Sequence, residues 1–98
     1  MSPRLKVSPV AQKEALEIQR YLEHATPDVG VRFRDELEAC WRLLLQFPGG
    51  SQVRYKLYRY AQLSTLRYHV IYSLQGDLVV VHHVRHMHRR TLKQFFGK

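Results

Sequence analysis

The apolar positions in the first half of the chain follow the spacing of a helix. Ala11, Ala15, Ile18, Leu22 and Ala25 recur at steps of four and three residues, so they share one face of an amphipathic helix. We expect this helix to begin after Ser8-Pro9. Serine caps helix N-termini, and proline has no N–H to leave unbonded in the first turn.

A second apolar run with the same spacing comprises Val29, Phe33, Leu37, Cys40 or Trp41, and Leu44. Thr26-Pro27-Asp28 is its start signal, with the acid facing the positive end of the helix, and Phe47-Pro48-Gly49-Gly50 ends it. Because only a few residues join the two runs, the sequence predicts an antiparallel helical hairpin.

After Gly50 the period of the pattern changes to two, which is typical of β-strands. Alternating runs predict strands at 53–58 and 65–74, and an apolar, β-branched run at 78–85 predicts a strand inside a sheet. Gln75-Gly76-Asp77 predicts a tight hairpin turn, since Gly76 can adopt positive φ. A short β-capable segment at 5–7 precedes the helices.

The order β-α-α-β-β-β predicts an α+β fold, with the N-terminal helical hairpin packed on a largely antiparallel four-stranded sheet. The chain has 98 residues and contains no repeat and no low-complexity linker. We therefore interpret residues 1–98 as a single domain.

Charge is distributed unevenly along the chain. Residues 1–50 carry seven basic and seven acidic side chains, whereas residues 51–98 carry nine basic side chains and one acid, Asp77. The second half thus holds the whole formal charge of +8, and we expect it to form a surface that attracts nucleic acid or an acidic protein. The alternative is that the excess basic residues serve only solubility.

Other features narrow the class of protein. Cys40 is the single cysteine, which excludes an internal disulfide and fits a reducing compartment. Its place on the second helix favours a buried structural thiol. No apolar run reaches the ~18 residues of a membrane span, and the first residues lack the apolar stretch of a signal peptide. The sequence therefore predicts a cytoplasmic protein.

Histidines 82, 83, 86 and 88 form the densest group of titratable side chains. On a regular strand His82 and His83 point to opposite faces, and no Cys, Asp or Glu lies near to complete a zinc site. We therefore expect no metal ion and no cofactor, and we interpret these histidines as surface or anion-contacting groups. No Gly-rich phosphate loop, paired-carboxylate site or Ser-His-Asp pattern is visible.

The remaining candidate is a basic and aromatic surface on the predicted sheet. It comprises Arg54, Lys56, Arg59, Arg67, His69, Arg85, Arg89 and Arg90, with Tyr55, Tyr58, Tyr60 and Tyr68 between them. Such a surface can bind RNA through phosphates and stacked bases, and it equally suits an acidic protein segment. Tyr68 and Tyr72 share a face with Val70 and are predicted to belong to the core.

Several short motifs occur in a characteristic order and spacing. They are Val7-Ser8-Pro9 with Ala11, Tyr21-Leu22, Phe33 with Leu37, Arg67-Tyr68-His69-Val70-Ile71-Tyr72, Gly76-Asp77, Val79-Val80-Val81, and His86 with Arg89. Together they resemble the RelE/ParE superfamily of small bacterial toxins from type II toxin–antitoxin systems, over essentially the full length. The fold of that superfamily agrees with the β-α-α-β-β-β order.

The RelE branch of this superfamily cuts mRNA in the ribosome, activating the ribose 2′-hydroxyl with basic residues. Here His69 and Met87 stand where RelE-like arginines are expected, and Lys93 stands near the place of a C-terminal tyrosine. Only Arg89 keeps a RelE-like basic identity. A methionine removes the electrostatic help that an arginine gives to a pentavalent phosphate.

The resemblance is closer to the ParE branch, whose members inhibit DNA gyrase by binding. The Arg-Tyr-x-Val-Ile-Tyr strand and the His-x-x-Arg end carry it, although Met87 stands where ParE-like chains often have Gly and Arg90 where they often have Asp. The resemblance implies a gyrase inhibitor that is neutralised by a cognate ParD-like antitoxin, which is acidic and disordered until bound.

These expectations assign residues to partners. The residues assigned to target binding are His86, Arg89, Arg90, Lys93, Phe95 and Phe96, and those assigned to antitoxin binding are Arg54, Lys56 and Arg67. For the two phenylalanines, the alternative is that they close the edge of the core.

Two other functions stay open. One is a RelE-like ribosome-dependent endoribonuclease that uses His69, His86, His88 and Arg89, and the other is a degenerate member that only binds antitoxin in repression. The nuclease requires His69, Arg89 and either His86 or His88 to converge on one concave patch, whereas scattered positions favour a binding protein.

Overall fold

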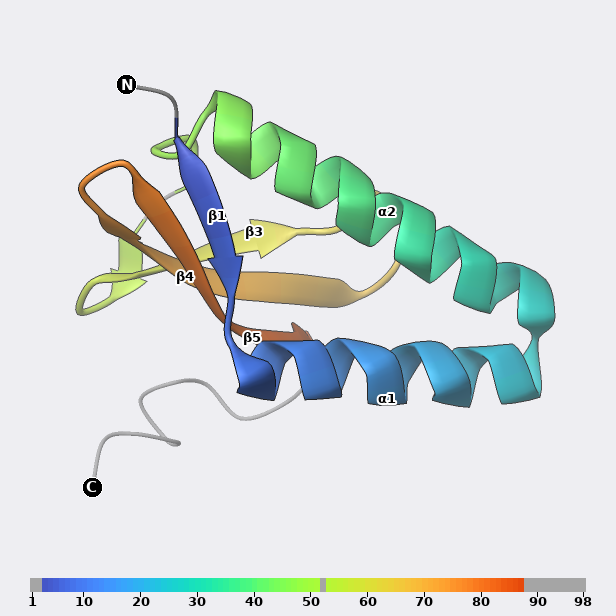
Figure 1. Ribbon diagram of the computed structural model, residues 1–98. Coiled ribbons are helices and arrows are strands. Elements are labelled where there is room, and N and C mark those ends of the chain that lie inside the picture. Colours follow the sequence, from blue (N-terminus) through green and yellow to red (C-terminus); the bar gives the residue numbers. More distant parts are fainter. Residues whose placement is uncertain (1–2, 52, 88–98) are drawn as a thin grey trace.

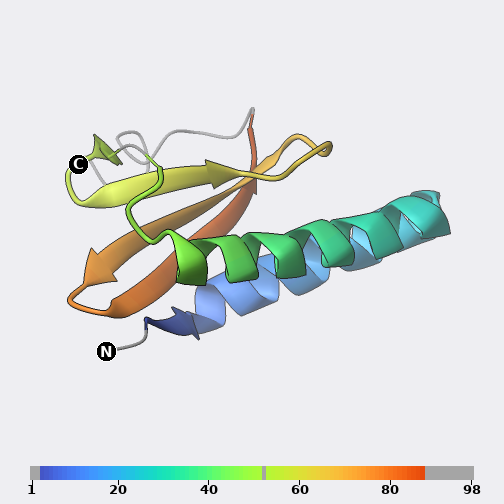
Figure 2. The same ribbon diagram turned by 90° about the horizontal axis from the view of Figure 1, so that it is seen from above.

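The computed structural model describes residues 3–51 and 53–87. Its elements are β1 (Arg4–Val7), α1 (Pro9–Ala25), α2 (Pro27–Gln46), β2 (Val53–Tyr55), β3 (Tyr58–Gln62), β4 (Tyr68–Gln75) and β5 (Leu78–His86). The predicted α+β class and helical hairpin are confirmed. Both helices lie along one face of the sheet, and their connected ends extend beyond it (Figures 1 and 2).

The start of α1 follows the capping prediction. The Ser8 hydroxyl oxygen accepts a hydrogen bond from the Ala11 N–H at 3.1 Å, and the hydroxyl donates to the His82 carbonyl at 3.2 Å. Ser8 therefore begins the helix and also ties it to the last strand. Thr26 precedes α2 at the equivalent position, but its side chain makes no capping hydrogen bond.

The sheet differs from the prediction in the number of strands and in one pairing. Its five strands are ordered β1-β5-β4-β3-β2. The β2–β3, β3–β4 and β4–β5 pairs are antiparallel, in keeping with the predicted, largely antiparallel sheet, whereas β1 runs parallel to β5. The sheet is therefore mixed.

The prediction of four strands was wrong because residues 53–58 form a hairpin rather than one strand. Tyr55 pairs with Tyr58 across the two-residue loop Lys56-Leu57. Lys56 has a φ of 52°, and the chain reverses direction there to begin β3. Apolar and polar residues alternate without interruption through this two-residue loop. The sequence pattern therefore does not show that the chain reverses direction there.

Strand β4 begins at Tyr68, later than predicted, because Glu36 of α2 holds the preceding segment. The N–H groups of Thr65 and Leu66 donate to the Glu36 carboxylate at 3.0 and 3.2 Å, and the Thr65 hydroxyl donates to its other oxygen. Burial raises the pKa of Glu36, but these hydrogen bonds outweigh it and leave the pKa below its usual value. Because the N–H groups of Thr65 and Leu66 donate to Glu36, they are not available for hydrogen bonds to a neighbouring strand.

The core lies between α2 and the near face of the sheet. It contains Phe33, Leu37, Cys40 and Leu44 from α2 and Val70, Tyr72, Val79 and Val81 from the sheet. Tyr72 is fully buried, and its hydroxyl donates to the Pro48 carbonyl at 3.0 Å, which satisfies the one polar group it brings into the core. Tyr72 is thus a core residue as predicted, while Tyr68 is half-buried against the same core.

Cys40 is buried, as predicted. Burial raises the pKa of its thiol to about 11, so the reactive thiolate is rare at neutral pH.

The two helices make close contact at Gly30. A Cβ atom at this position would lie 2.3 Å from Glu23 Cγ and 3.0 Å from the Glu23 backbone nitrogen. Both distances are shorter than van der Waals contact. Any side chain at position 30 would therefore force Glu23 or the two helices to shift.

Candidate functional site

The second half of β5 carries four of the candidate side chains, namely His82, His83, Arg85 and His86. β1 pairs only with residues 78–81, so residues 82–86 lie at an edge of the sheet beside α1 (Figure 1). The register shifts here, since Ile71 pairs with His83 while Tyr72 pairs with Val81. His82 is the extra residue, and such a bulge re-aims the neighbouring side chains.

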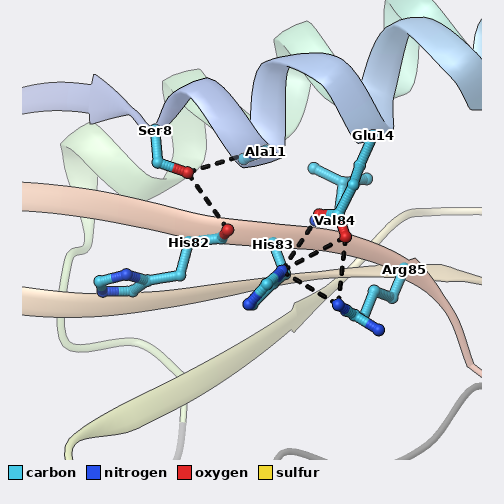
Figure 3. Close-up of polar contacts among 7 residues, drawn as sticks. All are labelled: Ser8, Ala11, Glu14, His82, His83, Val84 and Arg85. Atoms are coloured by element: carbon cyan, nitrogen blue, oxygen red, sulfur yellow. Dashed lines mark hydrogen bonds and ion pairs between the residues drawn. The ribbon is translucent and has the colours of Figure 1, made fainter. Parts of the chain in front are cut away.

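The bulge overturns the prediction that His82 and His83 point to opposite faces. Figure 3 shows both side chains on the same side of β5. The His82 Nε2 atom lies 2.7 Å from the Ser73 hydroxyl, and the His82 ring meets the Tyr58 ring edge-on at 5.1 Å. Burial lowers the pKa of His82, and the nearby His83 lowers it further, so His82 is neutral at pH 7.

Glu14 of α1 connects the helix to this edge of the sheet (Figure 3). The Val84 N–H donates to Glu14 Oε1 at 3.0 Å, and His83 Nδ1 lies 3.2 Å from the same oxygen. The Arg85 guanidinium lies 3.2 Å from Oε2. Glu14 thus satisfies a backbone donor that would otherwise be exposed at a sheet edge, and it neutralises an arginine whose side chain is only 6% exposed.

This network sets the electrostatics of Glu14. Burial raises the pKa of its carboxyl group, whereas the bonds from His83 and Val84 and the charges of His83 and Arg85 lower it. The result is a pKa below the usual value. Arg85 is therefore a structural residue, although the sequence analysis placed it on the partner-binding surface.

The structure separates the two described histidines of the nuclease hypothesis. Tyr68, Val70 and Tyr72 face the core, so His69 lies on the far face of the sheet, where its ring meets Tyr60 at 4.8 Å. His86 pairs with Tyr68, and the two rings lie 5.2 Å apart on the helix side. His69 and His86 therefore do not converge on one patch.

The environment of His69 favours a neutral ring. Burial lowers its pKa, and the charges of Arg54, Arg85 and His86 lower it further, although the His86 ring lies on the other face of the sheet. The Arg54 guanidinium lies 5.6 Å from the centre of the Tyr60 ring. A chain of contacts thus runs across the far face, from Arg54 through Tyr60 to His69.

His86 lines a groove of about 340 Å³ between α1 and β5. The groove is also lined by Glu17, Ile18, Tyr21, Tyr68 and Val84. A second groove of about 400 Å³ lies beside the helical hairpin and is lined by Ala15, Leu16, Leu37 and Trp41. Both grooves border α1 and offer concave apolar surface to a partner.

The three residues assigned to the antitoxin, Arg54, Lys56 and Arg67, are all exposed. Lys56 and Arg67 lie on opposite sides of β3 along the chain, and this strand of five residues spans about 17 Å. One partner that contacts both must therefore span about the length of this strand. Arg59 is used internally instead, since its guanidinium donates to the carbonyls of Gly49 and Ser51.

The other assigned residues lie outside the described ranges. They are His88, Arg89, Arg90, Lys93, Phe95 and Phe96. Within 3–51 and 53–87 no group of three or more His, Cys, Asp or Glu side chains could hold a metal ion. In the same ranges neither helix is long and apolar enough to cross a membrane.

Comparison with known proteins identifies the family. The family model for the ParE toxin of type II toxin–antitoxin systems, parDE, matches residues 5–91. The chain belongs to the ParE toxin family. No match to a curated protein sequence reaches significance.

The fold of this ParE family member is also found in a solved structure described as the chromosomal ParDE toxin–antitoxin system from P. aeruginosa. The TM-score is 0.76 at 12% sequence identity, and the match covers 87% of this chain and 96% of the other. At that identity the likeness concerns the fold.

Glu14 was assigned no role in the sequence analysis. A signal was present. Glu14 follows Ala11 by three residues and precedes Ile18 by four, so it lies at the border of the apolar stripe. An acid there faces the sheet, where a basic side chain can neutralise it.

Proposed function

We propose that this ParE family member inhibits DNA gyrase by binding it, without catalysis, and that a cognate antitoxin neutralises it. Membership of the ParE family carries the proposal. The opposite positions of His69 and His86 support it, since they argue against a RelE-like acid–base pair formed by these two residues. The site of action is the cytoplasm, where gyrase acts.

The proposed antitoxin is ParD-like, acidic and disordered until it binds. The two grooves that border α1 would receive its apolar side chains, and the exposed Arg54, Lys56 and Arg67 would pair with its acids. Lys56 precedes β3 and Arg67 follows it in the chain, and an extended segment can span the distance between them. The target-binding residues of the proposal are His86 and, beyond the described ranges, Arg89, Arg90, Lys93, Phe95 and Phe96.

Two assays on one preparation of the toxin test this function. Purified toxin is added to DNA gyrase in a supercoiling assay and to translating ribosomes in an mRNA cleavage assay. We expect inhibited supercoiling, intact mRNA, and no change in either result with His69→Gln. Cleavage that His69→Gln abolishes would instead establish the RelE-like nuclease, and inactivity in both assays would indicate a member that only binds antitoxin.

A further inference from the structure

The β2–β3 hairpin ends in an exposed tip, formed by Lys56 and Leu57. Leu57 is 76% exposed, more than any other large apolar side chain in the described ranges. Lys56 is also exposed, and its ammonium group lies 5.3 Å from the centre of the Tyr55 ring. An apolar side chain and a positive charge thus occupy the end of a protruding turn.

The sheet contains a second hairpin that serves as an internal comparison. Gln75 pairs with Leu78 across the two-residue loop Gly76-Asp77, and Gly76 has a φ of 64°. In both loops the first residue has positive φ, a conformation that costs glycine little and other residues more. The β4–β5 hairpin uses glycine there and a polar residue next, whereas the β2–β3 hairpin uses Lys56 and Leu57.

The requirements of the turn therefore do not explain why a lysine and a leucine occupy positions 56 and 57. Glycine would form the same turn with less strain, and a polar residue would avoid exposing a leucine to water. Residues kept in unfavourable backbone conformations often mark functional positions. Here the strained residue and the exposed leucine are neighbours, and together they present a positive charge beside an apolar anchor.

The shape of the tip indicates what kind of partner it fits. The two grooves beside α1 are concave and can receive side chains from a segment that folds on binding. Leu57 lies in the loop of a hairpin and is 76% exposed, so a partner that buries this leucine must supply the pocket for it. A folded protein offers such a pocket, whereas a disordered segment does not.

We propose that the β2–β3 tip inserts Leu57 into an apolar pocket with an acidic rim on the folded protein target of the toxin. The inference rests on the proposed function in that the target is taken to be DNA gyrase. Lys56 pairs with a carboxylate at the rim of the pocket. An antitoxin segment that pairs with Arg54 and Lys56 lies beside Leu57 without burying it, and so neutralises the toxin by keeping the target away from the tip.

The test compares Leu57→Ser with Leu43→Ser, which removes another leucine that is 55% exposed and lies on α2. We expect Leu57→Ser to raise the toxin concentration for half-inhibition of supercoiling by about tenfold or more, as for a central anchor residue. Leu43→Ser should change it by less than about twofold. Antitoxin affinity, measured by calorimetry, should stay within about threefold of wild type for both variants, because neither leucine lines a groove.

Lys56→Gly separates the charge from the turn, because glycine accepts positive φ. This variant should keep or raise the melting temperature while weakening inhibition at low salt. Unchanged inhibition by Leu57→Ser would overturn the proposal. So would a parallel loss of antitoxin affinity in that variant, which would assign the tip to the antitoxin.

Growth arrest, measured when cells are induced to express the toxin, tests the role of the tip separately from the proposal that the target is gyrase. If wild-type toxin arrests growth but leaves gyrase active, the proposed function fails, and arrest by the variants then decides the role of the tip. Relief of arrest by Leu57→Ser, with arrest retained by Leu43→Ser, would support the tip as the target-binding element. Equal arrest by both would refute it.

Discussion

Replacement of Glu14 by glutamine removes one charge from the contact between α1 and β5 and preserves the shape of the side chain. It leaves the Arg85 guanidinium, 6% exposed, without its carboxylate, while the amide oxygen can still accept from the Val84 N–H. Breaking a buried ion pair by removing one partner costs about 3–5 kcal/mol. Because the Glu14 side chain is 21% exposed, water lessens the loss, and we expect about 2–3 kcal/mol.

A loss of that size is large for a domain whose total stability is of the order of 5–15 kcal/mol. In domains of this length, 1 kcal/mol shifts the melting temperature by about 4–8 °C. Glu14→Gln should therefore melt about 10–20 °C below wild type at pH 7.

The difference should depend on pH in a defined direction. The pKa of Glu14 in the folded state lies below the ordinary value of 4.5. The carboxylate therefore stabilises the folded protein above that pH, and this contribution is lost as the pH falls through the folded pKa. The difference in stability between wild type and Glu14→Gln should have its full size at pH 7. It should shrink as the pH falls below 4.5, because Glu14 itself then becomes neutral.

Thermal melts and urea titrations of both proteins between pH 3 and pH 7 measure this gap. Glu17→Gln, one turn further along the same helix at an exposed position, is the matched control and should stay within about 0.5 kcal/mol of wild type. A Glu14→Gln protein that melts with wild type at pH 7, or a gap that does not close on acidification, would refute the role assigned to Glu14.

Three further predictions concern the helical hairpin, the antitoxin and the C-terminal segment. Gly30→Ala should lower the free energy of unfolding by about 1–3 kcal/mol in urea titrations, whereas Gly49→Ala, whose Cβ would meet nothing within 4 Å, should not show a steric loss. Reversal of Arg54 and Arg67 to Glu should weaken antitoxin binding in calorimetry, and unchanged affinity at low salt would contradict the electrostatic part of the interface. Deletion of residues 91–98 should abolish toxicity and preserve antitoxin affinity, whereas a melting temperature lowered by tens of degrees would place the two phenylalanines in the core.

The helices could be predicted from the sequence because two independent signals agree. The apolar spacing from Ala11 to Ala25 defines one face, and Ser8-Pro9 marks its start. Both signals come from residues close together in the sequence, so neither depends on contacts with the rest of the chain. The contact at Gly30 was not predicted, because it depends on where α2 crosses Glu23 of α1.

The sheet was predicted less completely because pairing, and not only alternation, determines it. Lys56 reverses the chain inside an alternating run, and no glycine or asparagine marks the turn. The bulge at His82 depends on the register between β4 and β5. The late start of β4 depends on Glu36, which lies 29 residues before Thr65 in the chain. The bulge and the Glu36 contact depend on residues distant in the chain, and the turn at Lys56 lacks the residue types that mark such turns, so periodicity reveals none of the three.

Net charge overstates the basic surface that the fold presents to a partner. Arg59 and Arg85 contribute to the charge of the second half, but Arg59 holds the segment after α2 and Arg85 is neutralised by Glu14. Within residues 53–87 the exposed cations are therefore Arg54, Lys56 and Arg67, with Lys56 before β3 and Arg67 after it in the chain. A partner bound by these residues releases few counterions, so its affinity should fall with salt far less steeply than a charge of +8 implies. Apolar contacts must then supply most of the binding free energy, and the grooves beside α1 and the exposed Leu57 are the surfaces that can provide them.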